Sequence, residues 1–276
     1  MKRFVKYLML ALVALSFGEM RAEELPYAPG EHIQLTINFK WAFRSDIATV
    51  DLNLKEDSDS TWHSLASIRT KPFFDAFYKI RDIYECKFRP DKEVTPVWYH
   101  RSVQEGKYWV EASYDWTPDA LEMRASIDKS TRPHRDTLYK EDYIIHDIIN
   151  IFYAVRAQNI GPDNRMDTRF LIVDRDIMEV RARYVETEYK KMKGREEKVP
   201  ARKIAVAVRS VTPSFDTNNV GLVLDAEWPE GEEFGQEGIF LWLTEDGNRL
   251  PVAFKAPLKM GSINGVLEEA SGLKYE

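Results

Sequence analysis

From residue 29 onward, apolar and polar residues alternate along most of the chain. In the clearest run, at 32–41, Ile33, Leu35, Ile37 and Trp41 fall on every second position. Successive side chains of a β strand point to opposite faces, so these residues would share one face. Further alternating runs, each bounded by turn residues, lie at 47–54, 62–68, 108–116, 121–127, 169–173, 177–185, 203–211, 220–228, 239–244 and 250–255.

About a dozen short strands at hairpin spacing are typical of an antiparallel sandwich, a barrel or a curved sheet. The chain shows no long β–α–β spacing, which a doubly wound parallel sheet requires. We therefore predict a mainly β protein, built as a curved antiparallel sheet or a half-open β-barrel.

Two segments break the alternation and predict helices. At 143–157 the apolar residues recur at intervals of three and four, as in Ile148 and Phe152, and Asp142 is a suitable N-cap. The segment 72–81 is short and predicts one or two helical turns. We expect one or both helices to pack on the concave side of the sheet.

The N-terminus has the pattern of a secretory signal peptide. Three basic residues precede an apolar run at 7–18, which is too short for a comfortable membrane span. Small residues follow, and we expect cleavage between Gly18 and Ala22. This divides the chain into a leader at 1–22 and one β-rich domain at 23–276, periplasmic or secreted, with no transmembrane span after cleavage.

Composition narrows the function classes. The formal net charge is −6, and the leader is basic, so the remainder is still more acidic. An acidic chain lacks the basic footprint of a general nucleic-acid binder. A single cysteine, Cys86, cannot form an internal disulfide, and the five histidines show no metal-ligand spacing. We therefore predict no metal site and no cofactor.

Aromatic residues and paired carboxylates are the remaining candidates for a site. Aromatic side chains on a concave sheet can line a cavity for an acyl chain or stack on a sugar ring, although most tryptophans only fill a core. Carboxylate pairs such as Asp82 with Glu85, or Asp174 with Asp176, could in principle serve glycosidase chemistry. We select four strand tryptophans as cavity candidates: Trp41, Trp98, Trp109 and Trp116.

Several segments, taken in order, resemble a family of exported Gram-negative bacterial proteins classed as a domain of unknown function. They are PGE at 29–31, FFDAFYKIRD at 73–82, PVWY at 96–99, EG at 105–106, DIINIFYAVR at 147–156, LTED at 243–246, RLPV at 249–252 and GS at 261–262. The resemblance implies positions and no activity. Four positions in these matching segments, Asp82, Asp147, Tyr153 and Arg156, are further candidate binding residues. Phe152, from the same helix segment, is the last candidate.

The same resemblance implies an architecture similar to the open β-barrel carriers of lipids and lipoproteins in the periplasm. Fold alone does not fix function. We expect Asp147 and Arg156 each to anchor the helix to a strand or loop, with Asp82 as a partner for Arg156.

We favour a non-enzymatic cell-envelope protein that binds an apolar ligand, such as a lipid, an acyl chain or a lipoprotein. Two alternatives stay open. One is a sugar-binding or sugar-cleaving exported protein, and the other is a structural module that binds a protein partner. The sequence does not indicate the oligomeric state.

Overall fold

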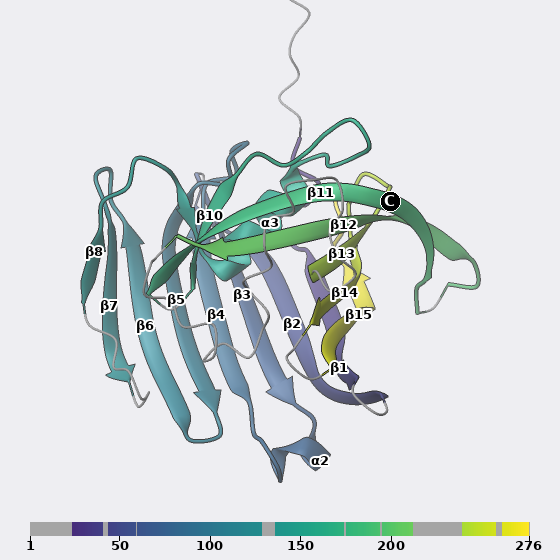
Figure 1. The fold of residues 1–276 in the computed structure, drawn as a ribbon, viewed down its shortest axis with the longest axis horizontal. Coiled ribbons are helices and arrows are strands. Elements are labelled where there is room, and N and C mark those ends of the chain that lie inside the picture. The colour runs from purple at the N-terminus through teal and green to yellow at the C-terminus, as the bar shows by residue number, and fades with distance from the viewer. Residues whose placement is uncertain are drawn as a thin grey trace, which may run out of the picture.

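The computed structural model describes residues 24–40, 44–58, 60–128, 136–173, 175–193, 195–211, 239–257 and 261–275. They form one open sheet of fifteen strands with two helices, which confirms the mainly β class (Figure 1). The leader, Trp41, Asp174 and the strand predicted at 220–228 lie outside these residues. The strands are β1 (His32–Lys40), β2 (Arg44–Ser58), β3 (Thr61–Thr70), β4 (Arg81–Phe88), β5 (Pro96–Glu105), β6 (Tyr108–Trp116), β7 (Leu121–Asp128), β8 (Thr137–Tyr139), β9 (Ile145–His146), β10 (Arg169–Val173), β11 (Asp176–Lys191), β12 (Lys198–Ser210), β13 (Ile239–Thr244), β14 (Pro251–Pro257) and β15 (Ser262–Ser271).

The strand order is β8-β7-β6-β5-β4-β3-β2-β1-β15-β14-β13-β12-β11-β10-β9. The first and last strands therefore lie side by side, and Ile33 of β1 is opposite both Leu52 of β2 and Ala270 of β15. Neighbouring strands are antiparallel except β9 and β10, which are parallel. The outer strands β8 and β9 do not pair with each other in this order, so the sheet is not a closed barrel.

The alternation in β1 holds with one slip. Ile33 and Ile37 are buried as predicted, but the next residue, Asn38, is buried as well. The register between β1 and β2 shifts at this point, between Ile37 and Asn38. A bulge of this kind places two residues opposite one, so the inward-facing position moves along by one residue.

The longer helix, α3 (Ile148–Ala157), begins later than the sequence predicts. Its N-cap is Asp147, and Asp142 lies outside the helix. The prediction of a start at 143 is wrong because Ile145 and His146 form β9, which pairs with β10. The predicted apolar face is also only partly correct, since Ile148 is 45% exposed.

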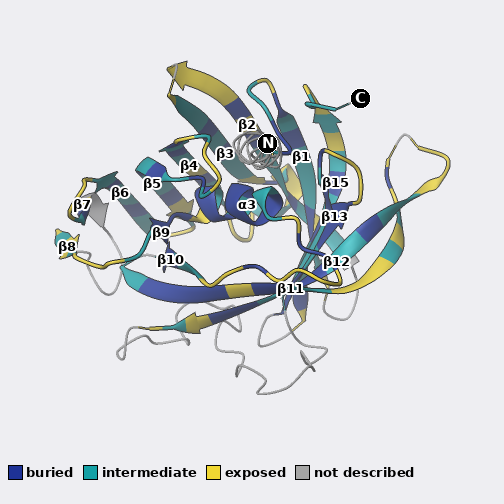
Figure 2. Cartoon of the chain, turned by 90° about the horizontal axis from the view of Figure 1, so that it is seen from above, coloured by how far each residue is buried: buried dark blue, intermediate teal, exposed yellow. Residues whose placement is uncertain are grey.

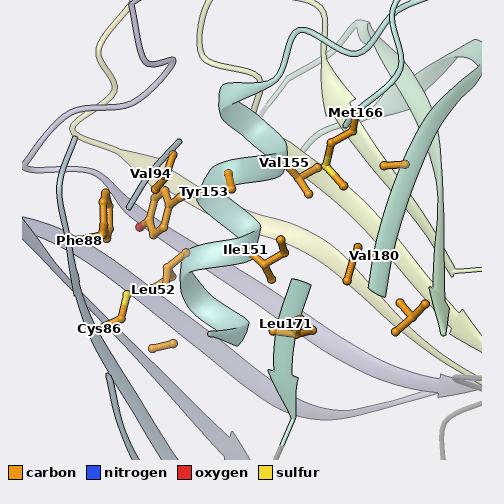
Figure 3. Packing of buried hydrophobic residues seen from close by; sticks show 14 of the residues in the cluster. Leu52, Cys86, Phe88, Val94, Ile151, Tyr153, Val155, Met166, Leu171 and Val180 are labelled. Atoms are coloured by element: carbon orange, nitrogen blue, oxygen red, sulfur yellow. The ribbon is translucent and has the colours of Figure 1, made fainter. Parts of the chain in front are cut away.

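Helix α3 lies between β3–β5 on one side and β10–β12 on the other (Figure 2). Figure 3 shows Tyr153 on the side of Phe88 and Val94, whereas Ile151 and Val155 lie towards Leu171, Val180 and Met166. A helix packed on two sides buries more than one stripe. This explains why its buried set includes the polar residues Asn150 and Arg156.

The shorter helix, α2 (Pro72–Asp75), is a single turn between β3 and β4. It has no buried residue, so it does not pack against the sheet as α3 does. Of the two predicted helices, only α3 is part of the core.

A buried ion pair anchors the C-terminal end of α3. Arg156 donates from Nη1 and Nη2 to the Glu31 carboxylate at 2.7 and 2.8 Å, and both side chains are almost fully buried. The guanidinium also donates to the backbone oxygens of Asn248 and Arg249, and it lies 5.0 Å from the centre of the Tyr27 ring. The helix end is thereby joined to the start of β1 and to the turn between β13 and β14.

The predicted pairing of Arg156 with Asp82 is wrong. Asp82 is buried in β4, where its carboxylate accepts the backbone N–H of Gln104 from β5. The sequence shows which residues are charged but not which of them lie close together in the fold. The actual partner, Glu31, is 125 positions from Arg156.

Replacing Arg156 with methionine leaves the Glu31 carboxylate buried without its cation. We expect Arg156→Met to lower the free energy of unfolding by about 3–5 kcal/mol, measured by urea denaturation. Arg124→Met is the matched control, because it breaks an exposed pair with Glu122 and removes about 0–1 kcal/mol. Equal losses in the two variants would show that the buried pair is not the anchor.

Candidate functional site

A cleft of about 390 Å³ lies where the two ends of the open sheet approach each other. We call it the seam cleft. It is formed by the end of β6, the starts of β5 and β7, and the segment from β8 to β9. Its lining residues are Arg89, Thr95, Pro96, Val97, Trp116, Thr117, Pro118, Asp119, Ala120, Leu121, Tyr139, Glu141, Tyr143, Ile144 and Ile145.

Side chains join the two sides of the seam where the backbone ladder is interrupted. The indole Nε1–H of Trp116 donates to the Ile145 carbonyl oxygen at 2.8 Å. The Tyr139 hydroxyl donates to the Arg175 carbonyl oxygen at 2.7 Å, in the turn between β10 and β11. These bonds fix two aromatic rings of the cleft wall and satisfy backbone acceptors near the unpaired strands.

The lining combines aromatic rings with charged groups. Tyr143 stacks on Phe170 with ring centres 3.7 Å apart, so its ring is held in place from outside the cleft. Burial, helped by nearby Glu141, raises the pKa of Tyr143 to about 12, and the phenol stays neutral. Aromatic faces can pack against an apolar chain or a sugar ring, and Arg89, Asp119 and Glu141 add polar contacts.

A buried polar cluster lies directly behind the cleft wall. The Asn150 amide nitrogen donates to the Val94 carbonyl oxygen at 2.7 Å, which leaves the Asn150 oxygen to accept from His146 Nδ1. His146 is fully buried, and its Nε2 has no hydrogen-bond partner among the described residues. Burial lowers the pKa of His146 to about 4, so the ring is neutral at pH 7.

Asp147 caps α3 beside this cluster. Its Oδ1 accepts the backbone N–H groups of Ile149 and Asn150 at 2.9 and 2.8 Å. Its Oδ2 is buried and has no partner in the part of the chain that the structure describes. Burial raises the pKa of Asp147 to about 7 against the opposing effect of the two N–H groups. Asp147 therefore caps the backbone of α3 itself and does not join the helix to a strand or loop as expected, whereas Arg156 does so at the other end.

The three tryptophan candidates that the structure describes do not come together at one site. Trp116 lines the seam cleft. In β5, Tyr99 is buried, and its neighbour Trp98 lies on the other face of the strand. There Trp98 stacks on His100, with ring centres 5.9 Å apart. Trp109 likewise alternates with buried Val110 in β6. These two therefore lie on the face of the sheet that turns away from the core.

The other candidates are spread over the core and the far end of β4. Tyr153 is buried, with its hydroxyl 3.2 Å from that of Ser64, and half-buried Phe152 makes an edge contact with its ring. Burial raises the pKa of Asp82 to about 7. Asp82 and Glu85 are three positions apart in one strand, so they point to opposite faces and do not form a catalytic pair.

The described residues contain no group of three or more His, Cys, Asp or Glu side chains that could hold a metal ion. Within the same ranges, no helix has the length and apolar character needed to cross a bilayer.

Sequence reasoning missed most of the cleft. The turn at 117–119 was visible as a Thr-Pro-Asp signal between two strands. The aromatic wall was not. Tyr139 comes from a segment without a regular pattern, Tyr143 was assigned to the start of the predicted helix, and both come close to Trp116 only through the fold.

The comparisons with known proteins agree with this fold. Residues 34–268 match the family described as proteins of unknown function, DUF3108. The chain belongs to this family. No curated protein matches the chain significantly. The family assignment confirms the resemblance to an uncharacterised domain family and adds no activity.

Solved structures with a similar fold include a β-barrel-like DUF1849 protein from Brucella abortus. It has 7% sequence identity and a TM-score of 0.54, with 90% of this chain and 98% of that chain covered. A putative lipoprotein from Parabacteroides distasonis (12% identity, 90% and 97% covered, TM-score 0.36) is more distant. So is a putative exported protein with YmcC-like fold from Bacteroides fragilis (10% identity, 91% and 99% covered, TM-score 0.34). At such identities the Brucella protein supports the fold alone.

The buried histidine makes a specific pH prediction. Because the pKa of His146 falls from 6.5 to about 4 on folding, the unfolded chain binds a proton between these values that the folded chain does not. Stability from this residue is therefore lost as the pH falls. From pH 6.5 to 5 the loss is about 1.5 kcal/mol, because the unfolded histidine is already half protonated at pH 6.5.

His146→Asn keeps a donor for the Asn150 oxygen and removes the titration. We expect urea denaturation at pH 6.5 and pH 5 to show a smaller loss of stability on acidification in this variant than in the wild type. Asp82 and Asp147, whose raised pKa values act in the opposite direction, are present in both proteins and cancel in the comparison. Identical pH dependence in the two proteins would contradict a buried, neutral His146.

Proposed function

We propose that the chain is an exported, non-enzymatic cell-envelope protein that binds an amphiphile, such as a lipid or an acyl chain, in the seam cleft. The sheet would act as a half-open barrel around α3, with the cleft at its opening. The observation that carries the proposal is the lining itself, in which Trp116, Tyr139, Tyr143 and Ile144 form the walls beside Arg89.

The size and place of the cleft support this function. A volume of about 390 Å³ is within the range of cavities that hold one small ligand. The aromatic rings are fixed by hydrogen bonds or stacking before any ligand arrives, which reduces the entropy cost of binding. An arginine beside an apolar wall matches a ligand with an apolar part and an anionic end.

Export is supported by the leader at 1–22. A basic start, an apolar run of signal-peptide length and small residues near the cleavage region point to the periplasm or the exterior. An apolar ligand in that compartment would need shielding from water, which a lined cleft provides.

Sugar binding is the second candidate, because Asp119 and Glu141 share the cleft with Trp116. Tryptophan faces stack on sugar rings, and carboxylates accept their hydroxyl groups. The lining also contains many aliphatic and proline side chains, which offer apolar contacts to an acyl chain but no hydrogen bonds to a sugar. This favours the amphiphile.

Native mass spectrometry of the protein purified from its own periplasm, followed by organic extraction and lipid analysis, tests the proposal first. We expect a co-purifying lipid at a ratio near one. A co-purifying glycan would favour the second candidate. A bare protein that takes up no dansyl-labelled fatty acid would overturn amphiphile binding.

A charge placed in the cleft locates the site. We expect Ile144→Asp to weaken binding of the dansyl-labelled fatty acid at least tenfold in a fluorescence titration, because a carboxylate in an apolar wall is costly to desolvate. Val185→Asp, at an exposed position on β11, is the matched control and should bind as the wild type does. Equal affinities in all three proteins would place the ligand elsewhere.

A further inference from the structure

The turn between β3 and β4 exposes a group of large aromatic side chains. Phe73 is 70% exposed, Phe77 75% and Tyr78 50%, while the short helix α2 that carries the first of them buries nothing. Figure 1 shows α2 at the far end of the sheet, beyond the ends of the neighbouring strands. We call residues 69–81 the aromatic tip. Clusters of exposed apolar residues mark surfaces that bind a partner or a membrane.

The tip is held in one shape by polar contacts at its base. Arg81 Nη1 donates to the Asp75 carboxylate at 3.0 Å, and Thr70 Oγ1 donates to the same carboxylate. The backbone N–H of Ile80 donates to Thr70 Oγ1, and the Tyr78 hydroxyl donates to Glu105 at 3.3 Å. The aromatic rings are therefore presented outward by a fixed turn.

The rings also contact one another. The ring centres of Phe73 and Phe74 are 5.2 Å apart, and those of Phe73 and Phe77 are 5.5 Å apart. Together they make one apolar surface at the end of a hairpin. This shape suits shallow insertion into the boundary between lipid headgroups and acyl chains, where aromatic rings are favoured.

The charge of the tip differs from that of the rest of the chain. Residues 69–81 contain four basic residues, Arg69, Lys71, Lys79 and Arg81, and one acidic residue, Asp75, which gives a net charge of +3. Two carboxylates of neighbouring strands face this segment, Asp46 at 4.0 Å from Lys71 and Glu105 at the Tyr78 hydroxyl, so the group as a whole has a net charge of +1. The whole chain has a net charge of −6. A positive, aromatic projection on a chain that is acidic as a whole is complementary to an anionic bilayer surface.

We propose that the aromatic tip docks the protein on an anionic lipid bilayer, with Phe73 and Phe77 inserted and the basic residues against the headgroups. This function does not depend on the seam cleft. Strand β4 begins at the tip with Arg81 and ends at Phe88, next to Arg89 of the cleft. Eight residues at about 3.3 Å each separate the two sites by roughly 26 Å.

Flotation with vesicles tests the proposal on the full mature chain. We expect the protein to float with phosphatidylcholine vesicles that contain 30% phosphatidylglycerol, and much less with pure phosphatidylcholine. The double variant Phe73→Ser/Phe77→Ser should bind at least tenfold more weakly, because two large apolar side chains no longer leave water. Both positions are exposed, so the variant should unfold at the same urea concentration as the wild type.

Two controls isolate the tip. Tyr189→Ser removes an aromatic ring that is 68% exposed on β11, and it should float as the wild type does. Lys79→Glu should reduce binding to the phosphatidylglycerol vesicles about fivefold or more, and added salt should weaken the wild type. The cleft variant Ile144→Asp should keep full vesicle binding, so failure of ligand binding and failure of docking can be told apart.

Three results would overturn the proposal. The first is a wild-type protein that stays at the bottom of the gradient with phosphatidylglycerol vesicles, as expected if the tip binds a protein instead. The second is equal flotation of the double phenylalanine variant, which would place the lipid contact elsewhere. The third is equal binding to neutral and anionic vesicles, which would exclude the electrostatic contribution.

Discussion

The buried pair of Arg156 and Glu31 holds together segments that the open sheet alone would leave apart. A closed barrel is completed by its last strand pair, but here β8 and β9 are not paired, so the interior depends on α3. A buried guanidinium is tolerated only when its donors have partners, because each unpaired ion costs several kcal/mol. Arg156 meets this condition at Glu31, Asn248 and Arg249, and it thereby fixes where the helix ends.

The same open topology explains why the cleft is where it is. Edge strands leave backbone groups that need partners, and a protein must cover them or pair them. In this chain Trp116 and Tyr139 supply side-chain hydrogen bonds across the seam, and both belong to the cleft wall. Bridging by long aromatic side chains leaves space between the strands that a backbone ladder would have filled. The cleft is thus a consequence of how the sheet ends, and its aromatic lining follows from the bridging.

Alternation was enough to predict the class of the fold, because most strands bury one face only. The predicted runs do not include β4, β5, β8, β9 or β15. β5 carries a buried arginine, Arg101, among its inward positions, and β15 contains Gly265, where the Phe254 ring occupies the space of a Cβ atom. Helix α3 was found, but its start and buried face were not, since the pairing of β9 with β10 and packing on two sides are tertiary effects. The candidate site residues could be selected only by their residue type, without knowledge of their neighbours in space. The partners of Arg156 and the neighbours of Trp116 lie too far along the chain for any local pattern to reveal them.

The aromatic tip shows the opposite relation between sequence and structure. Its sequence, read alone, predicts one or two helical turns, and we expected one or both helices to pack on the concave side of the sheet. In the structure the Asp75–Arg81 pair and Thr70 close the turn before a longer helix can form, so the rings point into solvent. Because polar contacts hold these apolar rings in the solvent, where they add nothing to the core, we infer that the rings bind a surface outside the protein. The positive charge around these rings, on a chain that is acidic elsewhere, favours a lipid surface over a second copy of the same acidic protein.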